Sequence, residues 1–368
     1  MSNIIAKRVS NYELFYDLVF VFTTSSLTGL LHHDGVSLRS ILAFITGNII
    51  ISSLWVTETF YLNCFGERDV LDIFTIIASM FVIGQLGLHV NMDFKTHALP
   101  FNFFLFLAYL IILLQYLLRG KKMGFSTEIR QSIFFTAILV LSFLAITIAT
   151  FFNFWTYDER SLLFFLIPFV LPFIVRPKGF FKNYSMINFP HAVERVQLIT
   201  IITFGEAVIA ILKTFQGNHL LLGALFFVGM AFLFMYYISH THLNMNHHQV
   251  ADTTLLFYAH AFLILGLNFF TVGLEMLPTH HGASGFACFL LGIILFYSSL
   301  LALTPYYAEE FLINKREKLE YGAYLILGST LLYFFREQLL FLSMIFVAMG
   351  YLMVTLTFRH RKKKNTSS

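Results

Sequence analysis

Near its start the chain reads ELFYDLVFVF from Glu13 to Phe22, an apolar run that contains two acids. The run is long enough to enter a bilayer, where an ionised carboxylate at mid-helix costs about 2.5–3.5 kcal/mol. Glu13 and Asp17 are four residues apart, so a helix places both on one face. We expect that face to turn away from lipid, toward other helices or water. The stretch therefore predicts a membrane-spanning helix with one buried polar face.

The composition of the whole chain is that of a membrane protein. Of its 368 residues, 58% are hydrophobic and 12% are charged, whereas a soluble domain carries about 25% charged residues. The net charge of +4 comes with basic residues scattered over short loops, which argues against nucleic-acid binding. Cys64 is expected in an inner loop and Cys288 in a later helix, so no disulfide framework is predicted. The sequence contains no phosphate loop, no G-x-S-x-G and no dinucleotide fingerprint, and we expect neither a cofactor nor enzymatic activity.

Apolar runs of about twenty residues are candidate spanning helices, and we count twelve. Most of the 24 Lys and Arg residues fall on one side if both termini and the even-numbered loops are cytoplasmic, as the positive-inside rule requires. The sixth and eleventh runs are short, so ten or eleven spans remain open. The expected spans are 12–31, 38–61, 70–90, 99–118, 131–152, 161–175, 192–212, 219–240, 254–274, 284–303, 321–335 and 338–358.

The hydropathy pattern recurs when the chain is shifted by 181 residues, which places Glu13 over Glu194 and Asn63 over Asn244. Six helices in each half would make the halves parallel repeats. The prediction is an all-α, polytopic integral membrane protein of about twelve transmembrane helices, built as two parallel six-helix repeats with both termini cytoplasmic. We expect the first repeat over 1–185, the second over 186–358 and a basic cytoplasmic tail over 359–368.

Polar residues lie at similar depths on the first, second, seventh and eighth predicted helices. Four acids against one arginine leave excess negative charge, so some acids must be protonated, bind a cation or contact water. Glu206 is a more isolated charge within the seventh helix, and Gly205 beside it would let another helix approach closely. The expected ion, proton or substrate site between the repeats comprises Glu13, Asp17, Glu58, Glu194, Arg195 and Glu206.

Two other interpretations of these residues stay open. Acids near a helix end can reach the interface, cap a neighbouring helix or pair with Arg8 and Arg195 for packing alone. A histidine cluster at the end of the eighth helix could supply metal chemistry, but the sequence has no H-E-x-x-H motif and no cysteine partner beside it. We therefore predict no metal site at His240, His242, His247 and His248.

Three motifs make the sequence resemble the bacterial low temperature requirement A family. They are Glu13 to Val21; Trp55, Thr57, Asn63 and Phe65; and His191 to Arg195 followed by Thr200 to Ile202 and Gly205 to Ile209. The chain departs from the family pattern at Cys64, where arginine is expected, and at Met235-Tyr236-Tyr237, where tryptophans are expected. The resemblance implies an integral protein of the bacterial plasma membrane linked by name to growth in the cold, and implies no established reaction.

The leading hypothesis is a transporter or channel for a small cation or a proton-coupled solute. The hypothesis is based on the excess of acids expected at the interface between the repeats. A non-catalytic membrane scaffold or cold-stress factor is the alternative, and a membrane-embedded enzyme is a weaker one. The expected partners are the lipid bilayer and a small cation or solute, and the sequence leaves association with further copies of itself open.

Overall fold

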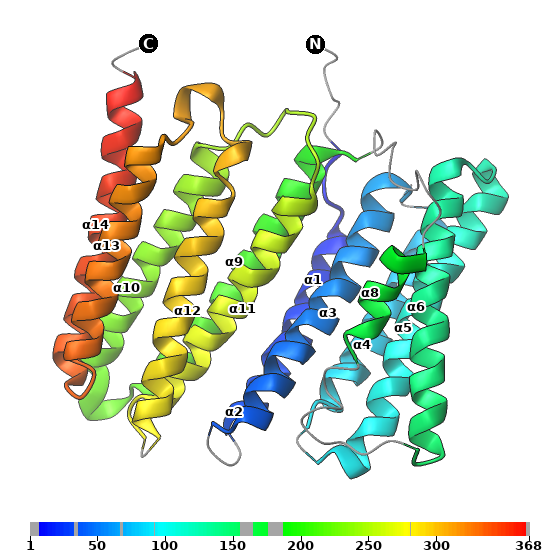
Figure 1. Cartoon of the computed structure of the whole chain (residues 1–368), viewed down its shortest axis with the longest axis horizontal. Coiled ribbons are helices and arrows are strands. Elements are labelled where there is room, and N and C mark those ends of the chain that lie inside the picture. The colour runs from blue at the N-terminus through cyan, green and yellow to red at the C-terminus, as the bar shows by residue number, and fades with distance from the viewer. Residues whose placement is uncertain are drawn as a thin grey trace. The chain divides into compact units, whose positions relative to one another are not determined.

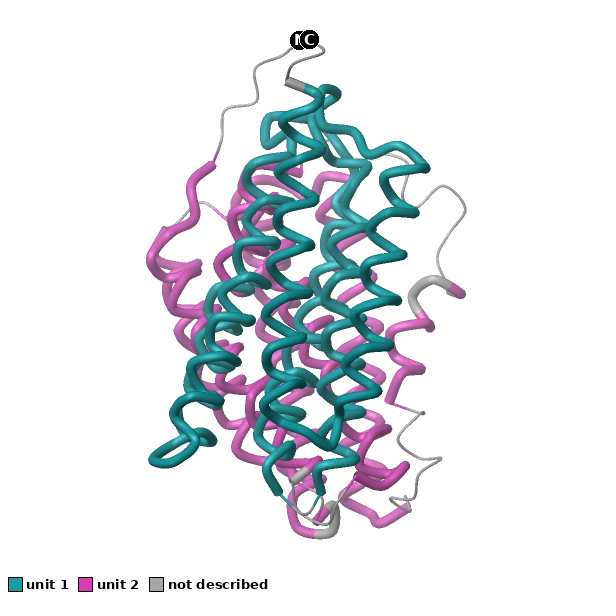
Figure 2. Tube along the Cα trace, turned by 90° about the vertical axis from the view of Figure 1, so that its left-hand side faces the viewer, with its two compact units in different colours: residues 1–4, 200–368 teal, residues 5–199 magenta. Residues whose placement is uncertain are grey.

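The computed structural model describes residues 7–32, 36–66, 69–91, 93–154, 165–175, 187–279 and 281–365. Within these residues the chain is helical and forms no strand, with one isolated bridge between Met245 and Tyr307 (Figure 1). It divides into two compact units, Ile5–Ile199 and Thr200–Ser368, which we call the N-terminal and C-terminal units (Figure 2). The boundary between them falls within one helix, α9, Phe189–Thr214.

The N-terminal unit is a bundle of apolar helices that ends with the first part of α9. Helix α4 packs on α1 and α5, and α5 packs on α6. Its described helices are α1 (Asn11–Ser26), α2 (Gly29–His32), α3 (Leu38–Cys64), α4 (Val70–Leu88), α5 (Phe94–Met123), α6 (Thr127–Phe151) and α8 (Ile167–Val175).

The C-terminal unit begins with the second part of α9. Helices α11 and α12 pack together, α10 packs on α14, and α13 lies beside α14 (Figure 1). Its remaining described elements are η1 (Gly217–His219), α10 (Leu220–Ile238), the π-helical turn η2 (Ser239–Leu243), α11 (Thr254–Met276), α12 (Gly282–Ala302), η3 (Thr304–Tyr306), η4 (Glu309–Phe311), α13 (Lys315–Phe334) and α14 (Leu339–Asn365).

Local sequence signals explain where several helices begin. The Oγ of Ser10 accepts the backbone N–H of Glu13 at 3.3 Å, and the Ser10 N–H donates to Glu13 Oε2 at 2.8 Å. This reciprocal capping box satisfies donors that the first turn of α1 leaves without helical partners. Asn314 and Glu317 form the same arrangement at the start of α13, and Asp69 caps α4.

The expectation that the acid-bearing face of the first helix turns away from lipid is confirmed. Glu13 is 2% exposed and Asp17 is 0% exposed, whereas Phe15 on the opposite face is 56% exposed. Leu18 and Phe22 share that exposed face. Since apolar side chains can face lipid at no cost and buried acids cannot, the two faces follow from the sequence pattern.

Close contact between α11 and α12 depends on glycines spaced seven residues apart. Gly266 on α11 faces Gly292 on α12, and Gly273 on α11 lies against the backbone of Phe289 on α12. Gly285 on α12 lies in the same way against the backbone of Met276 on α11. A Cβ on Gly273 would lie 2.3 Å from the backbone nitrogen of Phe289, a separation that no side chain can occupy. Small residues that let two helix backbones approach are typical of packing in membranes.

Ten of the described helices are long and apolar enough to cross a membrane, which matches ten of the twelve expected spans. The sixth expected span, 161–175, lies partly outside the described residues, and its described part is the nine-residue α8. The eleventh is α13, whose first turn carries Lys315, Arg316 and Lys318 and which is not among those ten. The expected position of Cys64 in a loop is wrong, because the residue ends α3.

Candidate functional site

A buried ion pair lies at the centre of the polar residues of the N-terminal unit. Arg195 on α9 donates from Nη2 to Asp17 Oδ1 on α1 at 2.6 Å, and both side chains are fully buried. The indole Nε1 of Trp55 on α3 donates to the same oxygen at 2.8 Å. The guanidinium carbon lies 5.7 Å from the centre of the Trp55 ring and 5.9 Å from that of Tyr16, so aromatic faces add to the stabilisation of the cation.

Glu58 on α3 is the second fully buried acid of this region. Its Oε1 accepts a hydrogen bond from Gln115 Nε2 on α5 at 2.8 Å, and the same amide nitrogen lies 3.1 Å from Thr75 Oγ1 on α4. Helices α3, α4 and α5 therefore each bring one polar side chain to this position. Among the described residues, no lysine, arginine or histidine forms an ion pair with Glu58.

Glu13 and Glu194 have the contacts of residues that fix helix ends. Glu13 belongs to the capping box of α1, and its Oε2 also lies 3.2 Å from His191 Nε2. Glu194 Oε2 accepts the backbone N–H of Val9 at 3.0 Å. The other ring nitrogen of His191 lies 3.1 Å from Asn63 Nδ2. These bonds join the chain before α1, the end of α3 and the start of α9.

Several buried polar atoms around the ion pair have no hydrogen-bond partner among the described residues. They are Asp17 Oδ2, Glu58 Oε2, Tyr16 Oη, and Nε and Nη1 of Arg195. An unsatisfied buried polar group costs about 1–3 kcal/mol, and more when it is charged. Five such atoms are therefore grouped around the ion pair, where the helices bury polar side chains instead of apolar ones.

Sequence reasoning missed a second buried ion pair in the same unit. Arg119 on α5 donates from Nη2 to both carboxylate oxygens of Asp72 on α4 at 2.8 and 2.7 Å, and the Tyr61 hydroxyl donates to Asp72 Oδ1 at 2.8 Å. Nearer the surface, Lys122 donates to Asp69 at 2.8 Å. This bond, together with the backbone N–H of Asp72, lowers the pKa of Asp69 below its ordinary value. The sequence does contain a signal for this pair. Asp72 lies at the start of the apolar run 70–90, and Arg119 comes directly after the run 99–118.

The structure describes all six expected site residues, and two of them are in direct contact. Asp17 and Arg195 meet directly and Glu58 lies one helical turn from Trp55 on α3, whereas Glu206 is half-buried in the part of α9 that belongs to the C-terminal unit. The close approach that Gly205 would allow is not used by the described residues, because none of their atoms lies within 4 Å of the position of a Cβ there.

The histidines at the end of α10 are also separated. His240 is fully buried in the π-helical turn, whereas His242 and His248 are exposed. The rings of His242 and His247 lie 5.6 Å apart. In the described part of the chain, no three His, Cys, Asp or Glu side chains are placed to hold a metal ion.

Among the described residues of the N-terminal unit, pairing each buried base with its acid leaves one buried acid without a basic partner. Asp17 is paired with Arg195, Asp72 with Arg119, and Glu13 with His191. Glu58 has an amide as its partner. Burying an ionised carboxylate without a cationic partner is costly in a medium of low dielectric constant, so a proton or a bound cation would matter most at Glu58.

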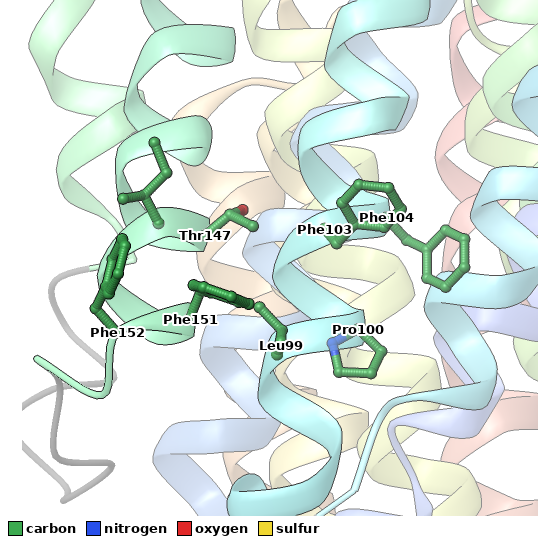
Figure 3. Close-up of a pocket in the computed structure, with 8 residues that line it drawn as sticks. Leu99, Pro100, Phe103, Phe104, Thr147, Phe151 and Phe152 are labelled. Carbon is green, nitrogen blue, oxygen red and sulfur yellow. The ribbon is translucent and has the colours of Figure 1, made fainter.

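An apolar groove lies elsewhere in the N-terminal unit, between the start of α5 and the end of α6 (Figure 3). Its volume is about 460 Å³, and Pro100, Phe103 and Phe151 are among its lining residues. Phe104 on the groove precedes Gln115 by eleven residues, or about 16 Å along a helix. The groove therefore does not belong to the polar site, and among the described residues that line it Thr147 alone has a polar side chain.

The chain is similar to one family of known proteins. The family model described as bacterial low temperature requirement A protein (LtrA) matches residues 8–363. The chain belongs to the LtrA family. No curated protein and no solved structure matches it. The resemblance seen in the motifs is thus confirmed over nearly the whole chain, and this LtrA protein is a multi-pass helical membrane protein of a bacterial family.

Proposed function

We propose that this LtrA protein is a plasma-membrane transporter or channel for a small cation or a proton-coupled solute, with Asp17, Glu58 and Arg195 at its centre. The observation that carries the proposal is Glu58, a fully buried acid whose Oε2 has no partner among the described residues and whose Oε1 is bonded to an amide. A structural ion pair would not need this additional acid.

The Asp17–Arg195 pair supplies the second element of the proposal. The pair is neutral as a whole, and Asp17 Oδ2 and Arg195 Nη1 each retain unused hydrogen-bonding capacity among the described residues. A proton or cation gained beside Glu58 changes the field at Arg195, whose guanidinium is permanently charged. A change of occupancy at Glu58 therefore alters the strength of the bond that joins α1 to α9. Such a link between ion binding and helix contacts is what coupled transport requires.

The proposed layout is twelve spans in two six-helix repeats with both termini cytoplasmic. Shifted by 181 residues, α3 becomes 219–245, and the observed span is Gly217–Leu243. Helices α1, α4, α5, α6 and α8 correspond in order to α9, α11, α12, α13 and α14 under the same shift. This correspondence supports repeats over 1–185 and 186–358 and counts α8 and α13 as spans, with 359–368 as a cytoplasmic tail.

The other acids take lesser roles in this proposal. Glu13 and Glu194 position the ends of α1 and α9, as their bonds to Ser10 and Val9 indicate. Glu206 is a second, separate candidate in the C-terminal unit. Arg119 is given a structural role, because it pairs with Asp72 and also lies 3.4 Å from Asp69.

Flux in proteoliposomes tests the proposal. Purified protein is reconstituted with a pH-sensitive dye inside the vesicles, and uptake driven by a pH gradient is measured for monovalent cations and small metabolites. Glu58→Gln and Asp17→Asn are expected to abolish the pH-dependent part of the flux. Glu310→Gln removes an exposed acid and is the matched control that keeps the flux.

Flux that persists in Glu58→Gln, Asp17→Asn and the double variant would end the case for this site. If the variants lose only folding stability and the native protein shows no flux with any tested solute, the protein is a membrane scaffold instead. The capping bonds of Glu13 and Glu194 are the feature that a scaffold would share.

A further inference from the structure

The C-terminal unit contains a cluster of hydroxyls and imidazoles that the proposed transport site does not use. His240 is fully buried where α10 passes into the π-helical turn η2. Its Nδ1 is hydrogen-bonded with the Tyr307 hydroxyl, and its Nε2 lies 3.5 Å from Thr357 Oγ1 on α14. A single π-helical turn within a membrane helix is a local irregularity that often marks a functional position.

The contacts continue from Thr357 toward the surface. The Tyr321 hydroxyl on α13 donates to Thr357 Oγ1 at 3.1 Å. The edge of the Tyr321 ring meets the His360 ring at a centroid distance of 5.5 Å. His360 Nε2 lies 2.9 Å from Glu320 Oε2, and the Glu320 side chain is 37% exposed. A sequence of polar groups thus runs from an exposed carboxylate to a buried imidazole.

Buried polar atoms along this sequence support a role beyond packing. Tyr236 Oη, Tyr297 Oη and His360 Nδ1 have no hydrogen-bond partner among the described residues. Tyr236 and Tyr297 are fully buried, and the Tyr236 ring lies 4.1 Å from that of His240. Apolar side chains of the same size would fill this space without the cost of unsatisfied groups.

We propose that His240 is a proton-binding site of the C-terminal unit, loaded from the surface through Glu320, His360, Tyr321 and Thr357. Histidine suits this role because each of its two ring nitrogens can accept or donate a proton. This inference concerns a different unit from the proposed transport site and stands without it. It assigns a proton, and no larger ligand, to the buried cluster.

The transfer keeps one proton on every hydroxyl. His360 takes a proton from Glu320 at one ring nitrogen and releases the proton of the other to Tyr321 Oη. The Tyr321 hydroxyl passes its own proton to Thr357, and the Thr357 hydroxyl passes its proton to His240 Nε2. In the tautomer with hydrogen on Nδ1, His240 donates to Tyr307 and its Nε2 is free to accept. Two movements are required. The His360 ring rotates toward the Tyr321 hydroxyl, and the Thr357 hydroxyl, which donates to the Met353 carbonyl at 3.0 Å, turns to His240 Nε2.

Several titratable and charged groups face this cluster from the surrounding elements. They are Tyr236 on α10, Tyr297 on α12, Tyr307 after η3, Glu317, Glu320 and Tyr321 on α13, and His360, Arg361 and Lys364 on α14. Arg361 bonds the Leu243 carbonyl at 2.6 Å, and Lys364 pairs with Glu317 at 3.0 Å. The fixed positive charges are therefore held at the helix ends, and the tyrosines around His240 are neutral.

Exchange of the His240 ring N–H with deuterated solvent tests the relay. The protein is labelled with ¹⁵N-histidine in nanodiscs, and the His240 resonance is the one that disappears in His240→Gln. If His240→Gln does not fold, the His240 resonance is assigned instead as the one that shifts in Tyr307→Phe, since the Tyr307 hydroxyl is hydrogen-bonded to His240. We expect Thr357→Val and His360→Gln each to slow the exchange about a hundredfold, the lower end of what a positioned proton-transfer group contributes.

The direction of the change separates a relay from a packing role. Loss of packing would promote local opening and accelerate exchange, whereas loss of a relay slows it. Tyr351→Phe removes an exposed hydroxyl on α14 and is expected to leave the rate unchanged. The proposal is overturned if the His240 ring N–H exchanges as fast as in the native protein, or faster, in both Thr357→Val and His360→Gln.

Discussion

Removing one member of the Asp17–Arg195 pair should destabilise the protein strongly, and removing both should cost much less than the sum. Both side chains are fully buried and their atoms are 2.6 Å apart, so the variant Arg195→Met leaves a buried carboxylate that still accepts a hydrogen bond from Trp55. Breaking a buried pair in this way costs about 3–5 kcal/mol. Asp17→Asn leaves the arginine charge buried and should cost a similar amount.

The interaction free energy comes from the four members of a double-mutant cycle. With both charges removed, neither variant side chain is a buried ion, and the double variant should be more stable than additivity predicts by at least about 1.5 kcal/mol. The unfolding free energy is measured by titrating purified protein in mixed micelles with a denaturing detergent. Tryptophan fluorescence is the signal, because Trp55 contacts Asp17 directly.

An exposed pair provides the control for the cycle. Arg336 and Glu337 are 3.2 Å apart with side chains 36% and 79% exposed, and their interaction free energy should stay below about 0.5 kcal/mol. If the effects of Asp17→Asn and Arg195→Met are additive within about 0.5 kcal/mol, the two charges do not interact as the structure shows. The candidate site would then lose its central contact.

Three further outcomes follow from the same contacts. Glu58→Gln should change the unfolding free energy by less than about 1 kcal/mol, because a protonated acid and an amide have the same shape and one hydrogen bond is at stake; a loss comparable to that of Asp17→Asn would show that Glu58 is ionised. Gly273→Ala should destabilise the protein by about 1–3 kcal/mol through overpacking. Gly205→Ala should stabilise it by up to about 1 kcal/mol, because no described atom lies within 4 Å of the new Cβ. Thermal unfolding of the two variants measures both effects. Lys122→Met removes the largest cause of the lowered pKa of Asp69, so a carboxyl titration followed by NMR should show that pKa rising.

The lowered pKa of Asp69 also fixes the sign of a pH effect. A carboxyl whose pKa is lower in the folded state contributes stability above its ordinary pKa and loses it as the pH falls through the folded value. The stability difference between native protein and Lys122→Met should therefore be present at neutral pH and disappear in acid. An unchanged difference in acid would show that the Lys122 side chain acts through packing.

Local signals in the sequence anticipated much of the architecture. The apolar runs predicted ten of the spans, and the acids four residues apart on the first helix predicted its buried face. The same reasoning placed Cys64 in a loop, because the pattern of apolar residues weakens before α3 ends. It missed Arg119, whose charge lies beyond the apolar run of its helix, although the side chain is buried against Asp72.

The sequence by itself determined the kind of molecule, since length and hydropathy decide which helices can cross a bilayer, and its motifs indicated the family. It also showed that acids outnumber bases on the polar faces. Only the tertiary structure showed which buried acid has no basic partner among the described residues. The partners come from α1, α3, α5 and α9, which are far apart in the chain. Hydropathy is a property of single segments and can be read from the sequence. The contacts of Asp17 with Arg195 and of Glu58 with Gln115 join different helices, and only the tertiary structure shows which side chains are close enough to form them.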